Sequence, residues 1–212
     1  GYQPFDGAVC ENIRITDNVF EDVFAGVGSH SMIYDRPYRN IVIQGNTFRN
    51  VKKRAVWCLN YVDSAVEDNI IENAGGVLVS CMYFPNTHLI PGTVAGMEGN
   101  HQNAGISVKN NQISISSVSQ INGNTWRGYG IEVQGAWVSD SSKAQAKGIP
   151  TGIYKETGVE VKGNMITGNG NGIRLYLADG CTVENNQLKL KKTASFSNMG
   201  IYLSASSKCD KR

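Results

Sequence analysis

The chain has 212 residues, of which 41% are hydrophobic and 18% charged, and 24 are glycine. This composition excludes a disordered or collagen-like chain and fits a single well-buried domain over residues 1–212. The net charge of +2, from 20 basic and 18 acidic residues, argues against nucleic acid as the main partner. No apolar stretch is long enough for a membrane span. The five cysteines have neither metal-finger nor C-x-x-C spacing, so we expect no metal site.

A six-residue signature, β-branched-x-x-Asn-x-hydrophobic, recurs along the chain. Its seven copies begin at Ile15, Ile43, Val66, Val108, Ile121, Val161 and Val183. Alternating apolar and polar residues before the Asn are typical of a short strand, and the two residues directly before it suit a tight corner. When coils stack, such Asn side chains can hydrogen-bond to one another as an internal ladder.

A second strand is expected about seven residues after the signature Asn. Its copies are Ala55–Cys58, Gly76–Val79, Gly130–Val133, Gly172–Leu175 and Gly200–Leu203. Four of them begin with Gly, which suits a corner where φ is positive or where neighbouring chains crowd the backbone. The clean signature intervals of 22 and 23 residues define one coil. We therefore predict an all-β solenoid, a parallel β-helix of roughly seven to eight coils with an Asn ladder.

The middle of the chain has an ambiguous register. Asn111 and Asn124 are 13 residues apart, too close to mark the same corner of two complete coils. We assign the corner to Asn124, because Gly130–Val133 follows it at about the usual distance. Gly105–Val108 is then interpreted as the second strand of an earlier coil.

Two segments interrupt the repeat, at about residues 84–104 and 135–158. We expect both to project from the solenoid as loops that wall a groove, since insertions in repeat proteins gather on the binding face. The chain begins almost directly in a coil and has no recognisable cap helix, and an uncapped solenoid end is prone to aggregate. We therefore expect these residues to be part of a longer chain.

With signatures such as Ile43-x-x-Asn46-x-Phe48 and the strand Gly172–Leu175, the chain resembles the right-handed parallel β-helix superfamily of pectate-lyase-like carbohydrate-active proteins. The resemblance covers nearly the whole chain and is specific for architecture, because the same coil serves lyases, hydrolases, epimerases, tailspikes and non-catalytic surface proteins. It implies an all-β, right-handed, single-stranded parallel β-helix in a secreted or cell-surface protein, of bacterial origin. It also implies a polysaccharide partner along the outer face of one sheet.

Alternation along the second strand predicts which side chains face outward. The predicted row consists of Tyr34, Trp57, Leu78, Ser107, Glu132, Arg174 and Tyr202, with Lys109, Gln134 and Tyr176 two residues further on. Aromatic rings stack on the apolar faces of sugars, while cations bind hydroxyls or carboxylates. The substrate-binding candidates are therefore Tyr34, Trp57, Lys109, Arg174, Tyr176 and Tyr202. The alternative is an ordinary sheet whose scattered aromatics pack under loops.

Four residues are catalytic candidates. A glycoside hydrolase needs two carboxylates roughly 5 to 10 Å apart. Asp35 and Glu132 are the best-placed acids, but about four coils at ~4.8 Å per strand separate them, so they cannot form one pair. A polysaccharide lyase needs a base and a cation, for which His30 and Arg36 are candidates. We expect no cofactor, except Ca²⁺ if the protein is a lyase.

The function therefore has two competing interpretations. One is a secreted polysaccharide-binding protein that also cleaves its ligand as a hydrolase or lyase, and the other is a non-catalytic glycan-binding, adhesion or structural module. The basic run Lys52–Arg54 could supply further cations, but a solvated corner is the commoner role for such a run. The sequence leaves the glycan, the bond and the oligomeric state open.

Overall fold

The computed structural model describes residues 10–29, 37–80, 104–115, 119–121, 124–126, 128–138, 152–191 and 198–205. All the regular elements in these residues are β-strands. They are β1 (Glu11–Thr16), β2 (Val19–Glu21), β3 (Val27–Gly28), β4 (Tyr38–Gln44), β5 (Thr47–Arg49), β6 (Arg54–Leu59), β7 (Tyr61–Val62), β8 (Ala65–Glu67), β9 (Ile70–Ser80), β10 (Ile106–Lys109), β11 (Gln112–Ile115), β12 (Ser119–Ile121), β13 (Asn124–Trp126), β14 (Tyr129–Gln134), β15 (Ala136–Val138), β16 (Gly152–Tyr154), β17 (Glu156–Thr157), β18 (Val159–Lys162), β19 (Met165–Gly168), β20 (Asn171–Tyr176), β21 (Ala178–Asp179), β22 (Thr182–Glu184), β23 (Gln187–Leu190) and β24 (Ile201–Ser204).

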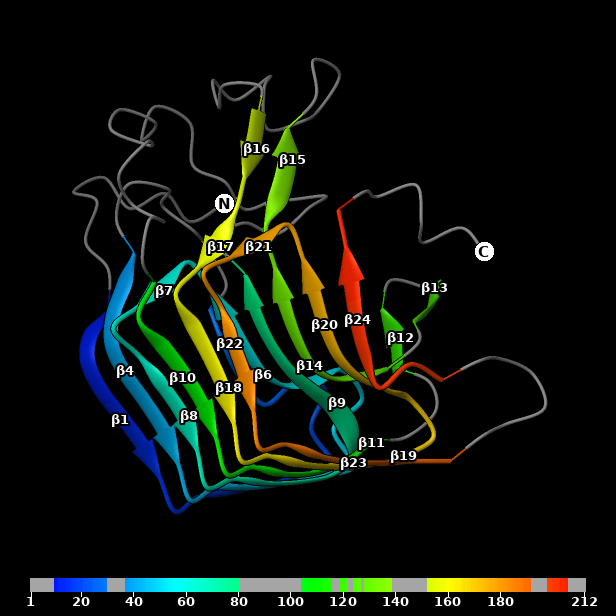
Figure 1. Ribbon diagram of the computed structural model, residues 1–212. Helices are drawn as coiled ribbons and strands as arrows, with labels where there is room; N and C mark the ends of the chain where they lie inside the picture. The colour runs from blue at the N-terminus through cyan, green and yellow to red at the C-terminus, as the bar shows by residue number, and fades with distance from the viewer. Residues whose placement is uncertain are drawn as a thin grey trace.

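Parallel, curled sheets surround a common core (Figure 1). Sheet A has the order β1-β4-β8-β10-β18-β22, with β7 beside β4. Sheet B (β2, β5, β9, β11, β19, β23) and sheet C (β3, β6, β9, β14, β20, β24) are joined through the long strand β9. The chain passes through sheets A, B and C in turn, and we call each circuit a coil.

This arrangement is consistent with a β-helix-like solenoid, as the repeat predicts. Sheet A receives one main strand from each circuit, so its six-strand path corresponds to six coils in the described residues. Roughly seven to eight were expected from the signatures. The difference arises because one signature copy does not belong to a coil, as shown below.

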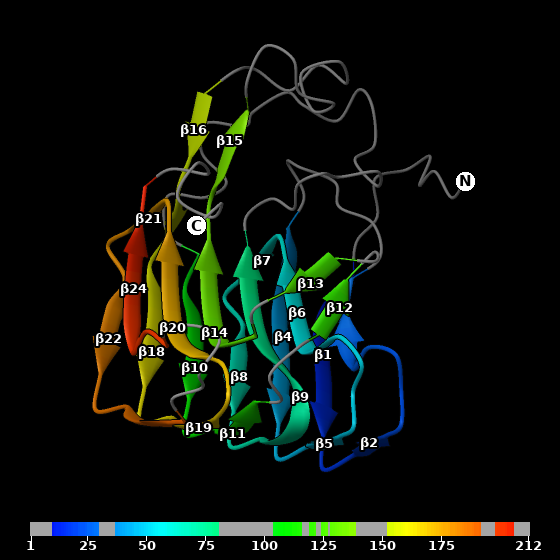
Figure 2. The ribbon, with the colours of Figure 1, turned by 90° about the vertical axis from the view of Figure 1, so that its right-hand side faces the viewer.

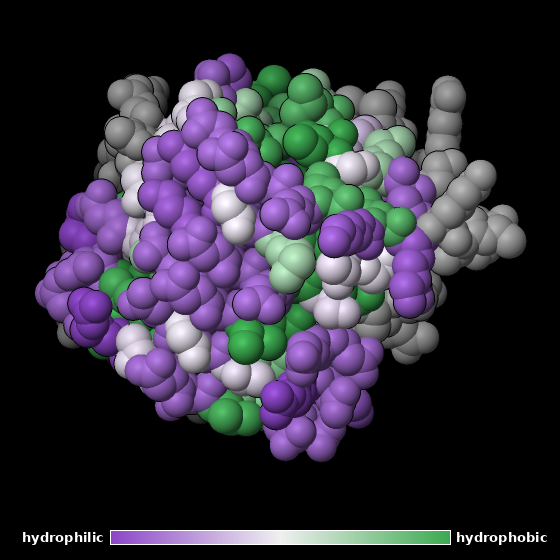
Figure 3. Space-filling model, turned by 60° about the horizontal axis from the view of Figure 1, so that its bottom comes forward, coloured by the Kyte–Doolittle hydropathy of each residue, from purple (hydrophilic) through white to green (hydrophobic). Residues whose placement is uncertain are grey.

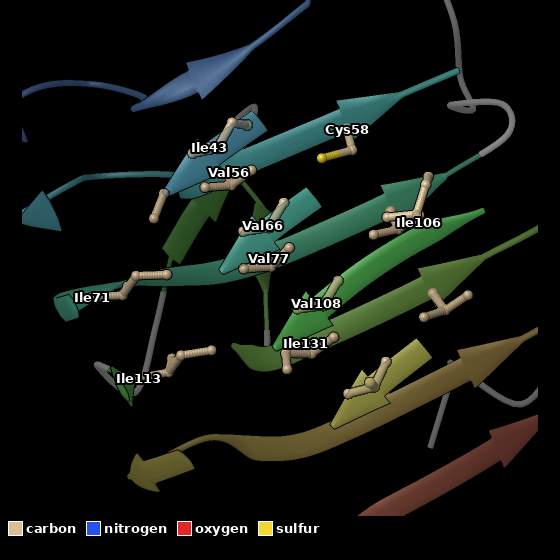
Figure 4. Close-up of a cluster of buried hydrophobic side chains, with 14 of the residues drawn as sticks. Ile43, Val56, Cys58, Val66, Ile71, Val77, Ile106, Val108, Ile113 and Ile131 are labelled. Carbon is tan, nitrogen blue, oxygen red and sulfur yellow. The ribbon is translucent and has the colours of Figure 1, made fainter. Parts of the chain in front are cut away.

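The core is made of the inward-facing residue of each strand (Figure 4). In sheet A this column contains Ile43, Val66, Val108 and Val161; in sheet B, Phe48, Ile71, Ile113 and Ile166; in sheet C, Val56, Val77, Ile131 and Ile173. Each of these side chains is at most 2% exposed. Burying one side chain of this size contributes about 1.5–3 kcal/mol, so the stacked columns are the main stabilising feature.

Six asparagines form a hydrogen-bonded row at the corner between sheets A and B. They are Asn18, Asn46, Asn69, Asn111, Asn164 and Asn186. Each Nδ2 donates to the Oδ1 of the next asparagine at 2.9–3.1 Å, and the backbone N–H of the same residue donates to that oxygen as well. The middle four are 0% exposed. Since an unpaired buried amide is costly, the row satisfies polar groups that the tight corner brings inside.

The assignment of the ambiguous corner to Asn124 is wrong, because Asn111 occupies the row. Residues 105–108 are equally misassigned: β10 lies in sheet A between β8 and β18 and is the first strand of its coil. Asn124 instead begins β13, which pairs antiparallel with β12. This hairpin is inserted between β11 and β14, and its local pattern imitates a coil corner.

Crowding explains the column of glycines at the start of the sheet C strands. A Cβ on Gly76 would lie 1.7 Å from the carbonyl oxygen of Gly130, and one on Gly172 would lie 2.2 Å from that of Gly200. None of these glycines has a positive φ. The sequence allowed two reasons for these glycines, and the close approach of neighbouring atoms is the one that applies to Gly76, Gly130 and Gly172, whereas Gly200 meets only Leu188 Cδ1 at 3.6 Å.

Two hairpins depart from the parallel stack (Figure 2). Strands β15 and β16 pair antiparallel within the segment 135–158 and extend beyond one edge of the sheets. The hairpin β12–β13 lies outside sheet C, in front of β6 and β9 in Figure 2. The other expected insertion, about residues 84–104, lies outside the described residues except for Ala104.

The outer faces of sheets A and B are mainly polar. On sheet B one outward row runs Glu21, Arg49, Glu72, Ser114, Thr167 and Lys189. Figure 3, which brings the lower side of Figure 1 forward, shows a largely hydrophilic surface with separate hydrophobic areas. The face with buried charges and grouped aromatic rings is that of sheet C.

Candidate functional site on the outer face of sheet C

Five of the predicted outward residues form one row across sheet C. The register pairs Trp57 with Leu78, Leu78 with Glu132, Glu132 with Arg174, and Arg174 with Tyr202. These residues alternate with inward valines and isoleucines, so their side chains leave the sheet on the side away from the core. Tyr176 and Gln134 lie in the adjacent outward row.

The predicted row is wrong for Ser107 and Lys109, which lie in β10 of sheet A. Lys109 forms an ion pair there with Glu160 at 2.7 Å, and Lys162 binds the same carboxylate at 2.9 Å. These hydrogen bonds, first Lys109 and then Lys162, lower the pKa of Glu160 to about 2. Lys109 therefore belongs to a surface charge cluster on another sheet and is not part of the sheet C site.

The remaining candidates His30, Tyr34, Asp35 and Arg36 lie outside the described residues. The roles proposed for them from the sequence therefore stay predictions. Of the four catalytic candidates, only Glu132 has a described position.

Glu132 is completely buried and lies between two arginines. Its Oε2 accepts a hydrogen bond from Nη2 of Arg54, and its Oε1 accepts one from Nη1 of Arg174 at 2.7 Å. The exposed fractions are 0% for Glu132, 5% for Arg54 and 3% for Arg174. We call these three residues the Arg–Glu–Arg cluster. The row is therefore covered where it carries its charges.

Arg54 is the functional-site residue that the sequence interpretation missed. The run Lys52–Arg54 was expected to be a solvated corner, and Lys52 is indeed exposed, but Arg54 is buried. The signal in the sequence is indirect. Glu132 and Arg174 fall in the same outward row, and a carboxylate buried there has a second oxygen that another cation can bind. Nothing in the local pattern of residues 52–54 distinguishes the buried arginine from its neighbours.

The cluster limits what Glu132 can do chemically. Both carboxylate oxygens already accept charge-assisted hydrogen bonds, which are about twice as strong as neutral ones. Proton transfer to a substrate would require breaking one of these bonds inside the protein. Removing one partner from a buried ion pair is strongly destabilising, because it leaves an uncompensated charge. The geometry therefore suits a fixed electrostatic anchor better than a general acid or base.

Aromatic rings surround the Arg174 end of the row. The Cζ atom of Arg174 lies 4.8 Å from the ring centroid of Tyr176, 5.6 Å from that of Tyr129 and 6.0 Å from that of Tyr202. Cations within about 6 Å of a ring centroid are attracted to its face. Tyr176 is 7% exposed, whereas Tyr129 and Tyr202 are half-buried.

A second cation–aromatic group lies at the other end of the row. The Nζ atom of Lys53 is 4.4 Å from the ring centroid of Phe24 and 5.9 Å from that of Trp57. Phe24 is 61% exposed, and Trp57 is half-buried. Between β6 and β24 there are four strand intervals, which correspond to about 19 Å at ~4.8 Å per interval. Partly exposed aromatic residues therefore lie at both ends of the row.

No group of three or more His, Cys, Asp or Glu residues in the described part of the chain is arranged to hold a metal ion. Nor does any helix there have the length and apolar character needed to cross a membrane. In comparisons with known proteins, no family model, no curated protein and no solved structure matches this chain.

Proposed function

We propose that the chain is a right-handed parallel β-helix whose asparagine row is the ladder of that fold, and that it binds a polysaccharide along the outer face of sheet C. A secreted or cell-surface location is part of the proposal. The observation that carries it is the pair of cation–aromatic groups, Lys53 with Trp57 and Arg174 with Tyr202, at the two ends of one outward row.

The spacing of the row supports an extended ligand. The middle of the row is buried, so the ligand would contact the aromatic groups at its two ends, which lie about 19 Å apart at ~4.8 Å per strand interval. Half-buried rings offer apolar faces for the C–H surfaces of sugars. A ligand that touched both ends would span several sugar units and gain from both contacts at once.

Binding is better supported than cleavage by the described residues. In the two outward rows of sheet C, Glu132 is the only acidic residue among those described, and its two oxygens are held by arginines. A hydrolase would need a second carboxylate about 5 to 10 Å away. Activity as a hydrolase, or as a lyase with Ca²⁺, would have to depend on His30, Asp35 and Arg36. We therefore propose a glycan-binding role and assign no bond cleavage.

The proposal is tested with ring-removing and ring-keeping variants. Trp57→Ala and Tyr202→Ala should each weaken retention on a panel of immobilised polysaccharides by at least severalfold, whereas Trp57→Phe and Tyr202→Phe should retain most of it. Ile70→Ala, which removes a 37% exposed side chain from the outer face of sheet B, is the matched control and should bind normally.

Affinity electrophoresis gives the binding strength, and circular dichroism confirms that each variant is folded. Unchanged binding by both alanine variants would contradict the proposal. Reducing-end and unsaturated-uronate assays on the same panel would detect cleavage. If cleavage were detected, and if Asp35→Asn or His30→Gln abolished it, the protein would be an enzyme rather than a non-catalytic binding module.

A further inference from the structure

The two arginines on the outer face of sheet C are withdrawn from solvent. Arg54 is 5% exposed and Arg174 is 3% exposed, and both guanidinium groups bind the carboxylate of Glu132, which is 0% exposed. Exchanging this carboxylate for an anion of a ligand would leave Glu132 buried without its counter-charges, which is strongly destabilising. The arginines are therefore engaged within the protein and do not serve to bind carboxylate or sulfate groups from outside.

Aromatic rings add to the enclosure of Arg174. Its Cζ atom lies 4.8 Å from the ring centroid of Tyr176, 5.6 Å from that of Tyr129 and 6.0 Å from that of Tyr202. A cation at these distances attracts the ring faces and helps to hold the rings in place. Because Arg174 is buried whereas Tyr129 and Tyr202 are only half-buried, the surface offered to a ligand at this end belongs to the rings.

At the other end of the row, Lys53 is directed at aromatic rings as well. Its side chain is half-buried, and its Nζ atom lies 4.4 Å from the ring centroid of Phe24 and 5.9 Å from that of Trp57. One partly exposed ammonium group gains little from pairing with an anion, because water and salt screen the interaction. Lys53 is therefore better suited to supporting the two rings than to recognising a charged sugar.

The centre of the row is unfavourable for an anionic ligand. The register places Glu132 between Leu78 and Arg174, so a ligand that reached both ends would pass over this buried carboxylate. An anionic group brought there would lose hydration beside a like charge, while the neighbouring guanidinium groups are already bound. An uncharged sugar avoids this cost.

The partly exposed groups on this face match uncharged sugars. Rings such as those of Trp57 and Tyr202 offer apolar faces for the C–H surfaces of pyranose units. Gln134 and Tyr129 are half-buried polar residues beside the row. Amide and phenol groups contain both donors and acceptors, as sugar hydroxyls do, whereas a carboxylate only accepts. Stacking and hydroxyl hydrogen bonds are therefore the interactions that the described residues can supply.

From these observations we propose that the polysaccharide bound along sheet C is neutral, a chain of uncharged sugars recognised by ring stacking and hydroxyl hydrogen bonds. The inference rests on the proposed glycan binding and adds the chemical class of the ligand. Binding should depend little on ionic strength, because salt screens charge interactions and not stacking. A neutral chain also lacks the carboxylate beside the proton that a polysaccharide lyase removes, so this class of ligand does not fit the lyase interpretation.

The test compares matched polysaccharides that differ only in charge. Galactan, mannan and glucan are each measured beside their C6-oxidised forms, in which a carboxylate replaces the primary alcohol. Isothermal titration calorimetry with the whole chain should give a dissociation constant severalfold lower for the neutral member of each pair that binds. The constant should change by less than about twofold between about 0.05 and 0.5 M NaCl.

Two lysine variants separate ring support from anion recognition. Lys53→Gln should weaken the binding of both members of a pair by the same factor, because the ammonium group supports the rings of Phe24 and Trp57. Lys189→Gln makes the same change at an exposed lysine on the outer face of sheet B. This matched control should leave both dissociation constants as they are in the native protein.

Equal or tighter binding of the oxidised forms would overturn the neutral ligand class while leaving the glycan-binding proposal intact. A Lys53→Gln variant that lost affinity for the oxidised forms alone would do the same, because it would assign Lys53 to anion recognition. If neither member of any pair were bound, and the panel of immobilised polysaccharides were not retained either, the glycan-binding proposal itself would fail. The two failures are therefore distinguishable.

Discussion

Arg54 and Glu132 form a buried ion pair although they are 78 residues apart in the sequence and their strands, β6 and β14, are not neighbours. Strand β9 lies between them, so the contact spans a whole coil. Arg174 holds the other oxygen of Glu132 from the next coil. One carboxylate therefore connects three coils on the outside of the sheet, independently of the core columns.

Replacing Glu132 with Gln should destabilise the protein by about 3–5 kcal/mol, because two buried arginines would lose their shared counter-charge. Glu72→Gln is the control: its ion pair with Arg49 is about half exposed and screened by solvent, so its loss should destabilise the protein far less. Urea unfolding followed by circular dichroism measures both. A Glu132→Gln variant as stable as the native protein would mean that the carboxylate is not a structural anchor.

The asparagine row predicts that replacing Asn111 and replacing Asn124 destabilise the protein by different amounts, although the two residues lie in similar signatures. Asn111→Ala would remove one donor and one acceptor from a completely buried chain of amides and leave the groups of Asn69 and Asn164 unmatched. We expect a loss of about 1–3 kcal/mol or more. Asn124→Ala, in the β12–β13 hairpin, should change the free energy of unfolding much less. Thermal unfolding measures both losses of stability. A larger loss for Asn124→Ala than for Asn111→Ala would mean that Asn124 marks the corner.

The glycine column makes a prediction about crowding. Gly172→Ala would place a methyl group 2.2 Å from the carbonyl oxygen of Gly200, so the two strands would have to separate. Overpacking of this kind destabilises by about 1–3 kcal/mol. Gly200→Ala meets only Leu188 Cδ1, at 3.6 Å, and should be tolerated. The midpoints of thermal unfolding of the two variants should therefore differ clearly, and equal midpoints would count against the close stacking.

The surface charges of sheet A predict a pH effect. Because Lys109 and Lys162 lower the pKa of Glu160 from 4.5 to about 2, this carboxylate stabilises the folded state above pH 4.5, and its contribution falls as the pH drops towards 2. Lys109→Met should move the pKa of Glu160 upwards, as should high salt. NMR titration of the Glu160 carboxyl group measures the shift, and Lys155→Met, at a separate ion pair with Asp179, should leave it unchanged.

The coil register was predictable where a single signature determines one corner. Asn46 and Asn69 are 23 residues apart, and Asn164 and Asn186 are 22 apart; in both pairs the structure joins them directly by side-chain hydrogen bonds. The error at Asn124 has a physical cause: a hairpin strand and a coil strand share the same alternation and turn residues, and only long-range pairing distinguishes parallel from antiparallel neighbours.

The candidate site was predictable only in part. Alternation placed Trp57, Glu132 and Arg174 on the same outer face, and the register agrees. The burial of Glu132 and Arg174 could not be predicted, because it depends on which segments cover the sheet, and an alternation of period two contains no information about covering layers. Arg54 was missed for the same reason, since the local sequence of a corner does not show whether a long side chain turns outward or reaches over the next coil.

The hairpin β12–β13 shows how tolerant the framework is of added sequence. It enters between β11 and β14, yet β14 still pairs in register with β9 on one side and β20 on the other. The parallel register therefore fixes the position of β14, whereas the length of the segment between β11 and β14 can vary. Residues 116–127 are consequently a natural point for exchange: a short linker or a foreign loop could replace them while the parallel pairing of β14 with β9 and β20 stays the same.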